Sequence, residues 1–343
     1  MKQNRWSYAK SGVDIHKKSR AVKNLIKTLK YRRTNTFKPV TKVGHYAGGV
    51  SFGEYILMLS TDGVGTKIFI AVEMKKYDTI GIDCIAMNVN DLLCTGAEPV
   101  AFVDYLAVAQ PNVTRERAIA KGLNVGAKLA NVNIVGGELA VMPDIITEFD
   151  LSGTALGVVH SKRVITGSKI RAGDIILGLK SSGIHSNGLT LARKLIQANN
   201  LNYHDYEPEI NARPGDELLK PTKIYVKPLL ELLDTVEVKG LAHITGGGLR
   251  NLIRLNSHVQ FRINKPFEPQ KIFLFLKKLG SLTTEELYQT FNMGMGFVII
   301  LSKKDVHDAI NILEKQEEIQ IVGEIVKGKG VNVPPLDLQY FEY

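Results

Sequence analysis

Apolar residues recur along this chain with two periods, and these periods predict alternating strands and helices. The continuous apolar run Tyr55–Leu59 is typical of a buried strand. Between Gly81 and Thr95 the apolar residues recur every three or four positions, which indicates a helix that ends at Gly96. Residues 67–72 fit either a strand or the start of a helix. The same patterns predict further strands over 100–108, 133–135, 149–159, 174–180, 297–301 and 320–326, and helices over 115–130 and up to residue 198.

The alternation is interrupted around residues 161–173, where the sequence becomes basic and polar. At 343 residues a chain of this composition is expected to form two domains, so we place the boundary there. Strands and helices alternate in both halves and antiparallel pairing is expected, which predicts an α+β fold. The predicted parts are a basic N-terminal segment and helix over 1–42, an N-terminal domain over 43–162 and a C-terminal domain over 172–343. Residues 199–222 are expected to be a surface excursion, and the residues after 326 an extended tail.

The composition is that of an ordinary soluble protein, with 44% hydrophobic and 23% charged residues. No apolar run reaches the roughly 18 residues of a transmembrane helix, and the first residues lack the apolar core of a signal peptide. Cys84 and Cys94 fall in one predicted helix, about 15 Å apart, which is beyond disulfide reach. We therefore expect a reduced cytoplasmic protein that does not bind a membrane.

The formal net charge of +10 is concentrated near the N-terminus. Between Lys10 and Lys42 there are eleven Lys or Arg residues and one acid, Asp14, and the rest of the chain is balanced. Such a segment could bind RNA or an anionic small molecule, or it could be a helix with one solvated face. No aromatic or zinc-ligand pattern accompanies the charge, so we predict no nucleic-acid partner.

Candidate chemistry begins where the first buried strand ends, in the heptad Thr61–Lys67. Asp62 can hold a hard cation such as Mg2+, Gly63 and Gly65 let backbone N–H groups approach oxyanions, and Lys67 supplies a point charge. These features suit a nucleotide phosphate, although a tight turn with a solvated Asp and Lys would have the same sequence. Neither a P-loop nor a dinucleotide-binding fingerprint is present, so any nucleotide is held by another design.

Acids and amides on the predicted helix 81–95 form a second group. Asp83 and Asn90 are two turns apart and share a face, and Asp91 lies beside Asn90. A carboxylate near a helix C-terminus opposes the helix dipole, which is easier to explain if a cation compensates it. The alternative is a solvated Asp on an exposed helix.

Three glycine-rich loops complete the candidate sites. Gly136, Gly137 and Glu138 follow a short predicted strand, and a plain turn would explain them equally well. Residues 181–188 join a strand to a helix and offer N–H groups to an anion. Thr245 precedes three consecutive glycines, for which the same role is expected. His185 and His243 lie in or beside these loops, as packing residues or as catalytic ones.

Taken together, these motifs resemble the phosphoribosylformylglycinamidine cyclo-ligase (AIR synthetase) family of the AIR synthetase-related ATP-binding superfamily. The resemblance covers nearly the whole chain, from about residue 8 to residue 324. It is carried, in this order, by Thr61–Lys67, Gly81–Asp83, Asn88–Leu92, Gly96–Pro99, Val135–Glu138, Ser182–Gly188, Pro221–Lys227, Ala242–Gly248 and Phe291–Gly294.

The resemblance implies a two-domain fold in which the N-terminal domains of a homodimer form a shared β-barrel, with ATP near the interface. It implies a ligase of de novo purine biosynthesis that closes the ring of formylglycinamidine ribonucleotide (FGAM) to give aminoimidazole ribonucleotide (AIR), ADP and phosphate. The substrates would be FGAM and ATP with Mg2+, and a requirement for K+ is left open. Phosphoryl transfer of this kind needs positioning and charge neutralisation more than a protein nucleophile.

The resemblance also assigns roles to residues. Asp62 and Asp91 would be the Mg2+ ligands, and together with Lys67 and His243 they are the predicted catalytic residues. The predicted ATP- and substrate-binding residues are Gly63, Val64, Gly65, Thr66, Lys67, Asn90, Gly137, Glu138, His185, Ser186, Asn187, Thr245, Gly246, Gly247 and Gly248.

Some positions depart from the family pattern. Leu139 stands where Thr is common, His45 and Tyr46 interrupt the glycine loop, and a Pro common after the triple glycine is missing. These departures affect local contacts rather than the reaction class. The alternatives are a thiamine-monophosphate kinase-like or selenophosphate synthetase-like enzyme, or an RNA-binding module that uses the basic N-terminus. The N-terminal cysteine common in selenophosphate synthetases is absent.

Overall fold

The N-terminal half forms one open five-stranded sheet in the computed structural model, which describes residues 6–40 and 45–342. The strand order is β1-β2-β5-β3-β4, and only the β3–β4 pair is parallel. The strands span Gly48–Phe52 (β1), Tyr55–Gly63 (β2), Glu98–Val108 (β3), Asn133–Val141 (β4) and Phe149–His160 (β5).

The C-terminal half forms a seven-stranded mixed sheet in the order β12-β11-β8-β10-β6-β9-β7. Every residue of β9, which lies next to the edge strand β7, is buried. The strands span Ile175–Lys180 (β6), Val238–His243 (β7), Gln260–Ile263 (β8), Met295–Leu301 (β9), Ile319–Val326 (β10), Gly330–Val333 (β11) and Leu338–Tyr340 (β12).

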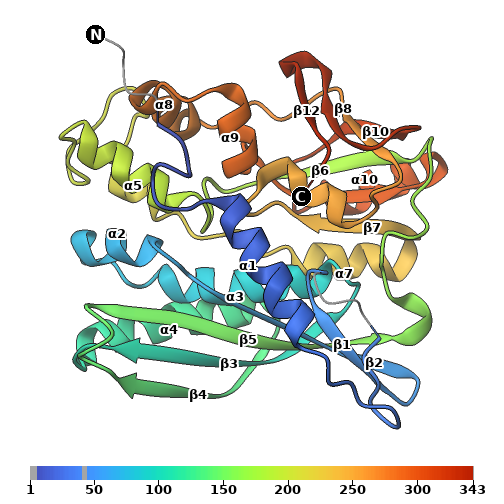
Figure 1. Ribbon diagram of the computed structural model, residues 1–343, viewed down its shortest axis with the longest axis horizontal. Helices are drawn as coiled ribbons and strands as arrows, with labels where there is room; N and C mark the ends of the chain where they lie inside the picture. Colours follow the sequence, from blue (N-terminus) through green and yellow to red (C-terminus); the bar gives the residue numbers. More distant parts are fainter. Residues whose placement is uncertain (1–5, 41–44, 343) are drawn as a thin grey trace.

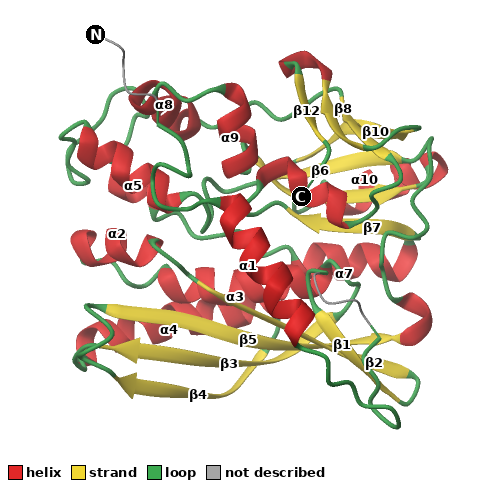
Figure 2. Ribbon diagram, in the orientation of Figure 1, coloured by secondary structure: helices red, strands yellow, loops and turns green. Residues whose placement is uncertain are grey.

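A layer of helices lies between the two sheets (Figures 1 and 2). It contains α3 (Ile80–Leu93), α4 (Val113–Ala130) and α7 (Val226–Thr235). Gly81 and Gly122 let helices α3 and α4 approach closely. A Cβ on Gly81 would lie only 2.2 Å from the Leu123 backbone nitrogen, and one on Gly122 only 2.4 Å from the Asp78 carbonyl oxygen. Helix α3 also contacts both β5 and β7, so it belongs to the core of both halves.

The remaining helices cover the outer parts of the molecule. The described elements are α2 (Lys67–Met74), α5 (Leu189–Ala198), α6 (Pro214–Leu218), α8 (Lys271–Gly280), α9 (Thr284–Thr290) and α10 (Val306–Leu313), with short 3-10 helices at Ser161–Arg163, Gly248–Arg254, Lys303–Asp305 and Pro334–Leu336. Helix α1 (Ile15–Thr28) runs obliquely across the front of both halves in Figure 1. The Asp14 side chain caps α1 by accepting from the Lys17 N–H.

Several predicted elements differ in extent from those observed. Residues 67–74 form a helix, and β4 continues to Val141, so Gly136–Glu138 lie within a strand rather than in a turn. The expected extended tail contains β11 and β12. Residues 199–222 are only partly a surface excursion, because α6 contacts α2 and its Leu218 is fully buried. The triple glycine leads into a 3-10 helix.

The α+β class and two-part architecture are as predicted, but the described N-terminal sheet is open and forms no closed barrel within one chain. The predicted boundary at 42/43 lies outside the described residues. Cys84 and Cys94 are free and buried, as expected for thiols that are not paired. Over the described ranges, no helix is both long and apolar enough to span a bilayer.

Candidate active site

Helix α3 carries the polar residues at the centre of the candidate site. Asp83, Asn88 and Asn90 are completely buried, because the sheet covers one side of α3 and the C-terminal half covers the other. Asp83 and Asn90, which the sequence places on one face of the helix, meet protein rather than water. The Asp91 side chain alone among these polar residues keeps a partial opening to solvent, with 17% of its area exposed.

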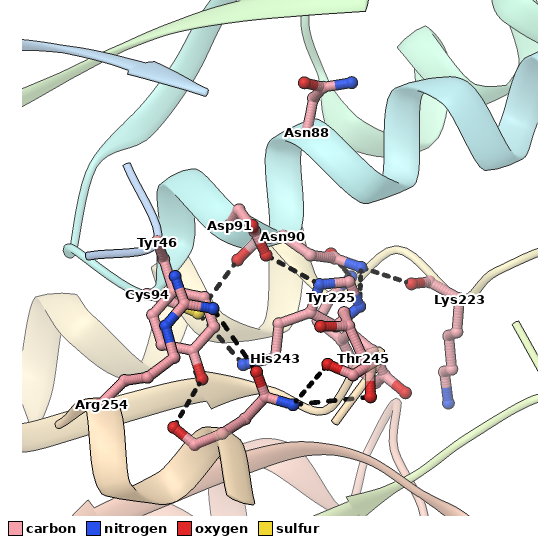
Figure 3. A network of polar contacts seen from close by, with 12 residues as sticks. Tyr46, Asn88, Asn90, Asp91, Cys94, Lys223, Tyr225, His243, Thr245 and Arg254 are labelled. Carbon is pink, nitrogen blue, oxygen red and sulfur yellow. Dashed lines mark hydrogen bonds and ion pairs between the residues drawn. The ribbon is translucent and has the colours of Figure 1, made fainter. Parts of the chain in front are cut away.

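Asp91 is held by His243 at the end of β7 (Figure 3). His243 Nδ1 lies 3.0 Å from Asp91 Oδ1, and His243 Nε2 lies 3.5 Å from Asn90 Nδ2. An ionised carboxylate only accepts hydrogen bonds, so His243 Nδ1 carries the proton of this contact. The His243 backbone N–H donates to Cys94 Sγ at 3.2 Å, which fixes the strand end against α3.

Asp62 is the penultimate residue of β2, on the same face of the strand as the buried Met58 and Ser60, and the charge of Asp91 acts on it. Its Oδ1 accepts from the Gly63 N–H at 2.8 Å. Partial removal of the carboxyl from water, and then the negative charge of Asp91, raise the pKa of Asp62, while Lys18 and His243 act in the opposite direction. A carboxyl whose pKa is raised by a neighbouring acid is a favourable environment for a divalent cation.

The described residues contain no group of three or more His, Cys, Asp or Glu side chains arranged to hold a metal. Two carboxylates would therefore supply a minority of the oxygen ligands of a Mg2+ ion. Phosphate oxygens and water usually complete such a shell. The donor set fits a cation that arrives with a nucleotide better than a permanently bound one.

The rest of the heptad divides into an open part and a buried part. Gly65 has φ +71° and open space where a side chain would lie, so its backbone is accessible. Val64 is fully buried and its N–H donates to the Leu151 carbonyl oxygen. The Thr66 hydroxyl lies 2.9 Å from the hydroxyl of Thr190 on α5.

Lys67 does not face the open part of the heptad. Its side chain is completely buried and its Nζ lies 2.8 Å from Asp83 Oδ2. The same ammonium donates to the Lys220 carbonyl oxygen at 2.6 Å. Burial lowers the pKa of Lys67, and the Asp83 carboxylate counteracts this. The structure therefore places this predicted phosphate-binding amine in an internal ion pair.

The loop Ser182–Gly188 lies against the site from the C-terminal half. His185 is buried with φ +60°, and its Nε2 accepts from the Ser182 N–H at 3.3 Å. Burial, followed by the charges of His243, Lys67 and Lys223, lowers the pKa of His185 well below its usual range, so this imidazole is neutral. The Ser186 hydroxyl lies 3.2 Å from the Thr222 hydroxyl.

The triple-glycine loop lies beside this one. A Cβ on Gly246 would lie 2.9 Å from Asn187 Oδ1, so the two loops are in contact. Gly247 and Gly248 both have positive φ, and a Cβ on Gly248 would lie 1.9 Å from the Tyr288 carbonyl oxygen, so only glycine fits there. Asn251 Nδ2 donates to the Gly248 carbonyl oxygen at 2.8 Å and lies within 3.5 Å of the Thr245 carbonyl oxygen, which holds the loop in place.

Gly137 and Glu138 are not brought to the two acids within one chain. In the sheet, Glu138 pairs with Tyr105, and Gly137 pairs with Asp104. Paired residues share a face, so Glu138 lies on the face opposite to α3, with the exposed Tyr105. Gly137 is required because a Cβ there would lie 2.5 Å from Asp104 Oδ1.

Asp104 and His45 belong to this part of the molecule, although the sequence predicted no role for either. Asp104 shares a row of the sheet with Asp62, through Gly153, and burial raises its pKa. An acid inside an otherwise apolar strand was the available signal. His45 has its pKa lowered to about 4, first by burial and then by Arg254, whose guanidinium stacks 4.0 Å from the Tyr46 ring centre.

Comparison with protein families decides the relationship. Residues 44–159 match the AIR synthase related protein N-terminal domain, and residues 171–334 match the corresponding C-terminal domain. This chain belongs to the AIR synthase related family. The family predicted from the sequence is thereby confirmed.

Curated relatives of this family member align over the whole chain. The phosphoribosylformylglycinamidine cyclo-ligase of Methanosarcina barkeri is 50% identical over 340 residues, which cover 99% of this chain and 100% of that protein. That of Thermococcus kodakarensis is 50% identical over 332 residues, covering 95% and 97% of the two chains. Similarity to these relatives does not favour a thiamine-monophosphate kinase-like enzyme, a selenophosphate synthetase-like enzyme or an RNA-binding module.

Solved structures with the same fold are more distant. The thiamine monophosphate kinase of Aquifex aeolicus is 16% identical with a TM-score of 0.65, and the alignment covers 95% of this chain and 99% of that one. The protein tt0281 of Thermus thermophilus is 18% identical with a TM-score of 0.66, covering 93% and 97%. At this identity the likeness extends to the fold alone.

Proposed function

We propose that this family member is the cyclo-ligase of purine biosynthesis, a ligase that converts FGAM and ATP into AIR, ADP and phosphate. Identity of about one half to cyclo-ligases over their full length supports this reaction. The observation that carries it in the structure is the meeting of Asp62, Asp91 and His243 with the two glycine-rich loops of the C-terminal half.

The chemistry matches a site rich in backbone donors and without a protein nucleophile. The formyl oxygen attacks the γ-phosphorus, the bond to the β-phosphate oxygen breaks, and ADP leaves. The amidine nitrogen then attacks the activated carbon, a C–N bond forms, the C–O bond breaks and phosphate leaves, while the nitrogen loses a proton. Each step needs alignment and stabilised negative charge.

Asp62 and Asp91 are the proposed Mg2+ ligands. The raised pKa of Asp62 beside the charge of Asp91 is what a cation would relieve, so these residues fit the ion. When bound, Mg2+ would neutralise phosphate charge. His243 fixes the orientation of Asp91 through Nδ1, and Asn90 holds the other side of the imidazole.

The two loops are the proposed anion contacts of FGAM or ATP. His185 is neutral and turns the loop, so Ser186 and Asn187 are the side chains we assign to phosphate. Thr245, Gly246 and Gly247 would add backbone N–H groups, and Gly65 would add that of the heptad, whereas the Gly63 N–H is occupied by Asp62 Oδ1. In this proposal Lys67 does not contact ATP or FGAM directly.

We propose that the active molecule is a homodimer. The face of the N-terminal sheet opposite to α3 exposes Leu59 (50%), Val103 (41%) and Tyr105 (41%). A second copy on this face would cover these apolar residues and bring Glu138 of each chain into the interface. Localisation in the cytoplasm stays a prediction.

The direct test is an assay of the purified protein with FGAM, ATP and Mg2+, followed by detection of AIR and phosphate in equal amounts. Omission of FGAM is the control for ATP hydrolysis alone. ATP consumption that depends on FGAM but yields no AIR would rule out ring closure. Activity with thiamine monophosphate instead of FGAM would support the kinase-like alternative.

A further inference from the structure

The heptad Thr61–Lys67 faces two parts of the molecule. Asp62 at its start lies with Asp91, whereas the two residues at its end contact the C-terminal half. The Thr66 hydroxyl lies 2.9 Å from that of Thr190, and Lys67 Nζ lies 2.6 Å from the Lys220 carbonyl oxygen. One short segment therefore connects the proposed cation site to the other domain.

Asp83 is the centre of the buried contact. Its Oδ1 accepts from the Thr222 N–H at 2.7 Å, from the Thr222 hydroxyl at 2.6 Å and from Lys67 Nζ at 3.0 Å. Its Oδ2 lies 2.8 Å from the same ammonium. Lys67 and Asp83 have no exposed surface and Thr222 has 1%. Hydrogen bonds to an ionised group are short and directional, so this pair fixes Thr222 more tightly than an apolar contact would.

The segment 220–225 is held at two places by the same helix. Seven residues after Asp83, Asn90 Nδ2 donates to the Lys223 carbonyl oxygen at 2.8 Å, and the Tyr225 N–H donates to Asn90 Oδ1 at 3.1 Å. On its other side the segment holds the Ser182–Gly188 loop. The Ser182 hydroxyl donates to the Pro221 carbonyl oxygen at 2.6 Å, and the Ser186 hydroxyl lies 3.2 Å from that of Thr222.

We propose that Lys67 and Asp83 are positioning residues that set the Ser182–Gly188 loop relative to Asp62 and Asp91. Neither touches a substrate. They act through Thr222, whose hydroxyl joins the ion pair to Ser186. Loss of this link would shift the loop slightly relative to Asp62 and Asp91, and small misplacements of positioning groups reduce turnover strongly. The catalytic consequence rests on the function proposed above, and the structural one does not.

The test replaces the pair without leaving a buried charge. In the double variant Lys67→Met, Asp83→Leu, apolar side chains of similar volume occupy both positions, which proteins often tolerate. We expect kcat at saturating substrates to fall roughly tenfold or more. The Mg2+ concentration for half activation should stay unchanged because Asp62 and Asp91 are intact. The matched control is Lys239→Met, Asp174→Leu, which removes a largely buried ion pair of the C-terminal half and should retain kcat.

A second readout needs no activity. Backbone amide exchange within 182–188 should become about tenfold faster in the double variant and in Thr222→Val, whereas Thr222→Ser should retain protection because it keeps the hydroxyl. Failure of ring closure in the wild type would refute the proposed function and leave this readout intact. Unchanged exchange in 182–188, or a folded double variant with kcat within about twofold of wild type, would overturn the positioning role. A parallel loss of Mg2+ activation would instead place Lys67 at the phosphates.

If the double variant does not fold, comparison of Thr222→Val with Thr222→Ser is sufficient to test the positioning role. These two substitutions differ in the hydroxyl that meets both Asp83 and Ser186. Equal exchange and equal kcat in the two variants would overturn the proposal.

Discussion

At the scale of single residues, the site depends on how two carboxylates are oriented by their neighbours. His243 fixes Asp91, and the Gly63 N–H fixes Asp62. The charge of one acid raises the pKa of the other. A cation and phosphate oxygens would complete the arrangement, so each carboxylate has a function that an amide cannot supply.

Asp62→Asn or Asp91→Asn should therefore reduce kcat by about a hundredfold or more, because an amide is neutral and a weaker Mg2+ ligand. Steady-state assays over a Mg2+ series measure this. The exposed Asp144→Asn is the matched control and should retain activity. Near-normal ring closure in both active-site variants would refute the metal assignment.

The same Asp62→Asn change should stabilise the metal-free protein. A carboxyl whose pKa is higher folded than unfolded destabilises the fold once ionised. This penalty is full at pH values above the pKa of Asp62 in the folded protein. It disappears as the pH falls below the pKa of the same carboxyl in the unfolded chain. At pH 7 the variant should melt at a higher temperature than wild type, and the difference should shrink towards pH 4. A lower melting temperature for the metal-free variant at pH 7 would contradict the assigned shift.

The residue scale also shows where prediction from sequence stops. Lys67 follows a glycine-containing turn, as phosphate-binding lysines do, and nothing local reveals that Asp83 neutralises it. Thr222, which completes that contact, is 139 positions from Asp83. Gly136–Glu138 were expected in a turn because glycines favour turns. Gly137 is instead needed within β4 because the Asp104 carboxylate occupies the space of a side chain.

At the scale of elements, periodicity located α3 within a few residues but not its surroundings. The apolar stripe predicts a helix. The polar face is buried by the segment 220–225 of the other domain, which the local pattern of the helix does not reveal. β4 was predicted too short for a related reason. Its glycines weaken the strand pattern, and pairing with β3 continues through them to Val141.

Helix α1 is the element whose role is most open to test. It carries the basic side chains of residues 17–27, and Lys18 is close enough to Asp62 to lower the pKa of its carboxyl. Charge reversal at Lys17, Lys18 and Lys23 should raise the KM for ATP or FGAM about tenfold, with the effect weakening at high salt. Steady-state kinetics at two ionic strengths measure this.

Reversal of the exposed Lys315 is the control for net charge alone. If the triple variant keeps both Michaelis constants, the basic face of α1 is only a solvated surface.

At the scale of the whole molecule, the open N-terminal sheet predicts self-association. Wild-type protein should sediment with the mass of two chains, and Leu59→Glu with Val103→Glu should shift it to one, because both side chains lie on the exposed face. Leu274→Glu, on α8 and 49% exposed, is the control and should stay dimeric. A monomeric wild type at working concentration would exclude the dimer.

The shared position of α3 has a consequence for how ligands enter. This helix is core to both halves, and Asp83 and Asn90 bind the backbone of the opposite half through buried hydrogen bonds. A clamshell motion would have to break these bonds, whose side chains are completely buried. Ligand exchange is therefore expected to occur at the rim, by displacement of surface segments such as α1, while the two halves keep one fixed orientation throughout turnover.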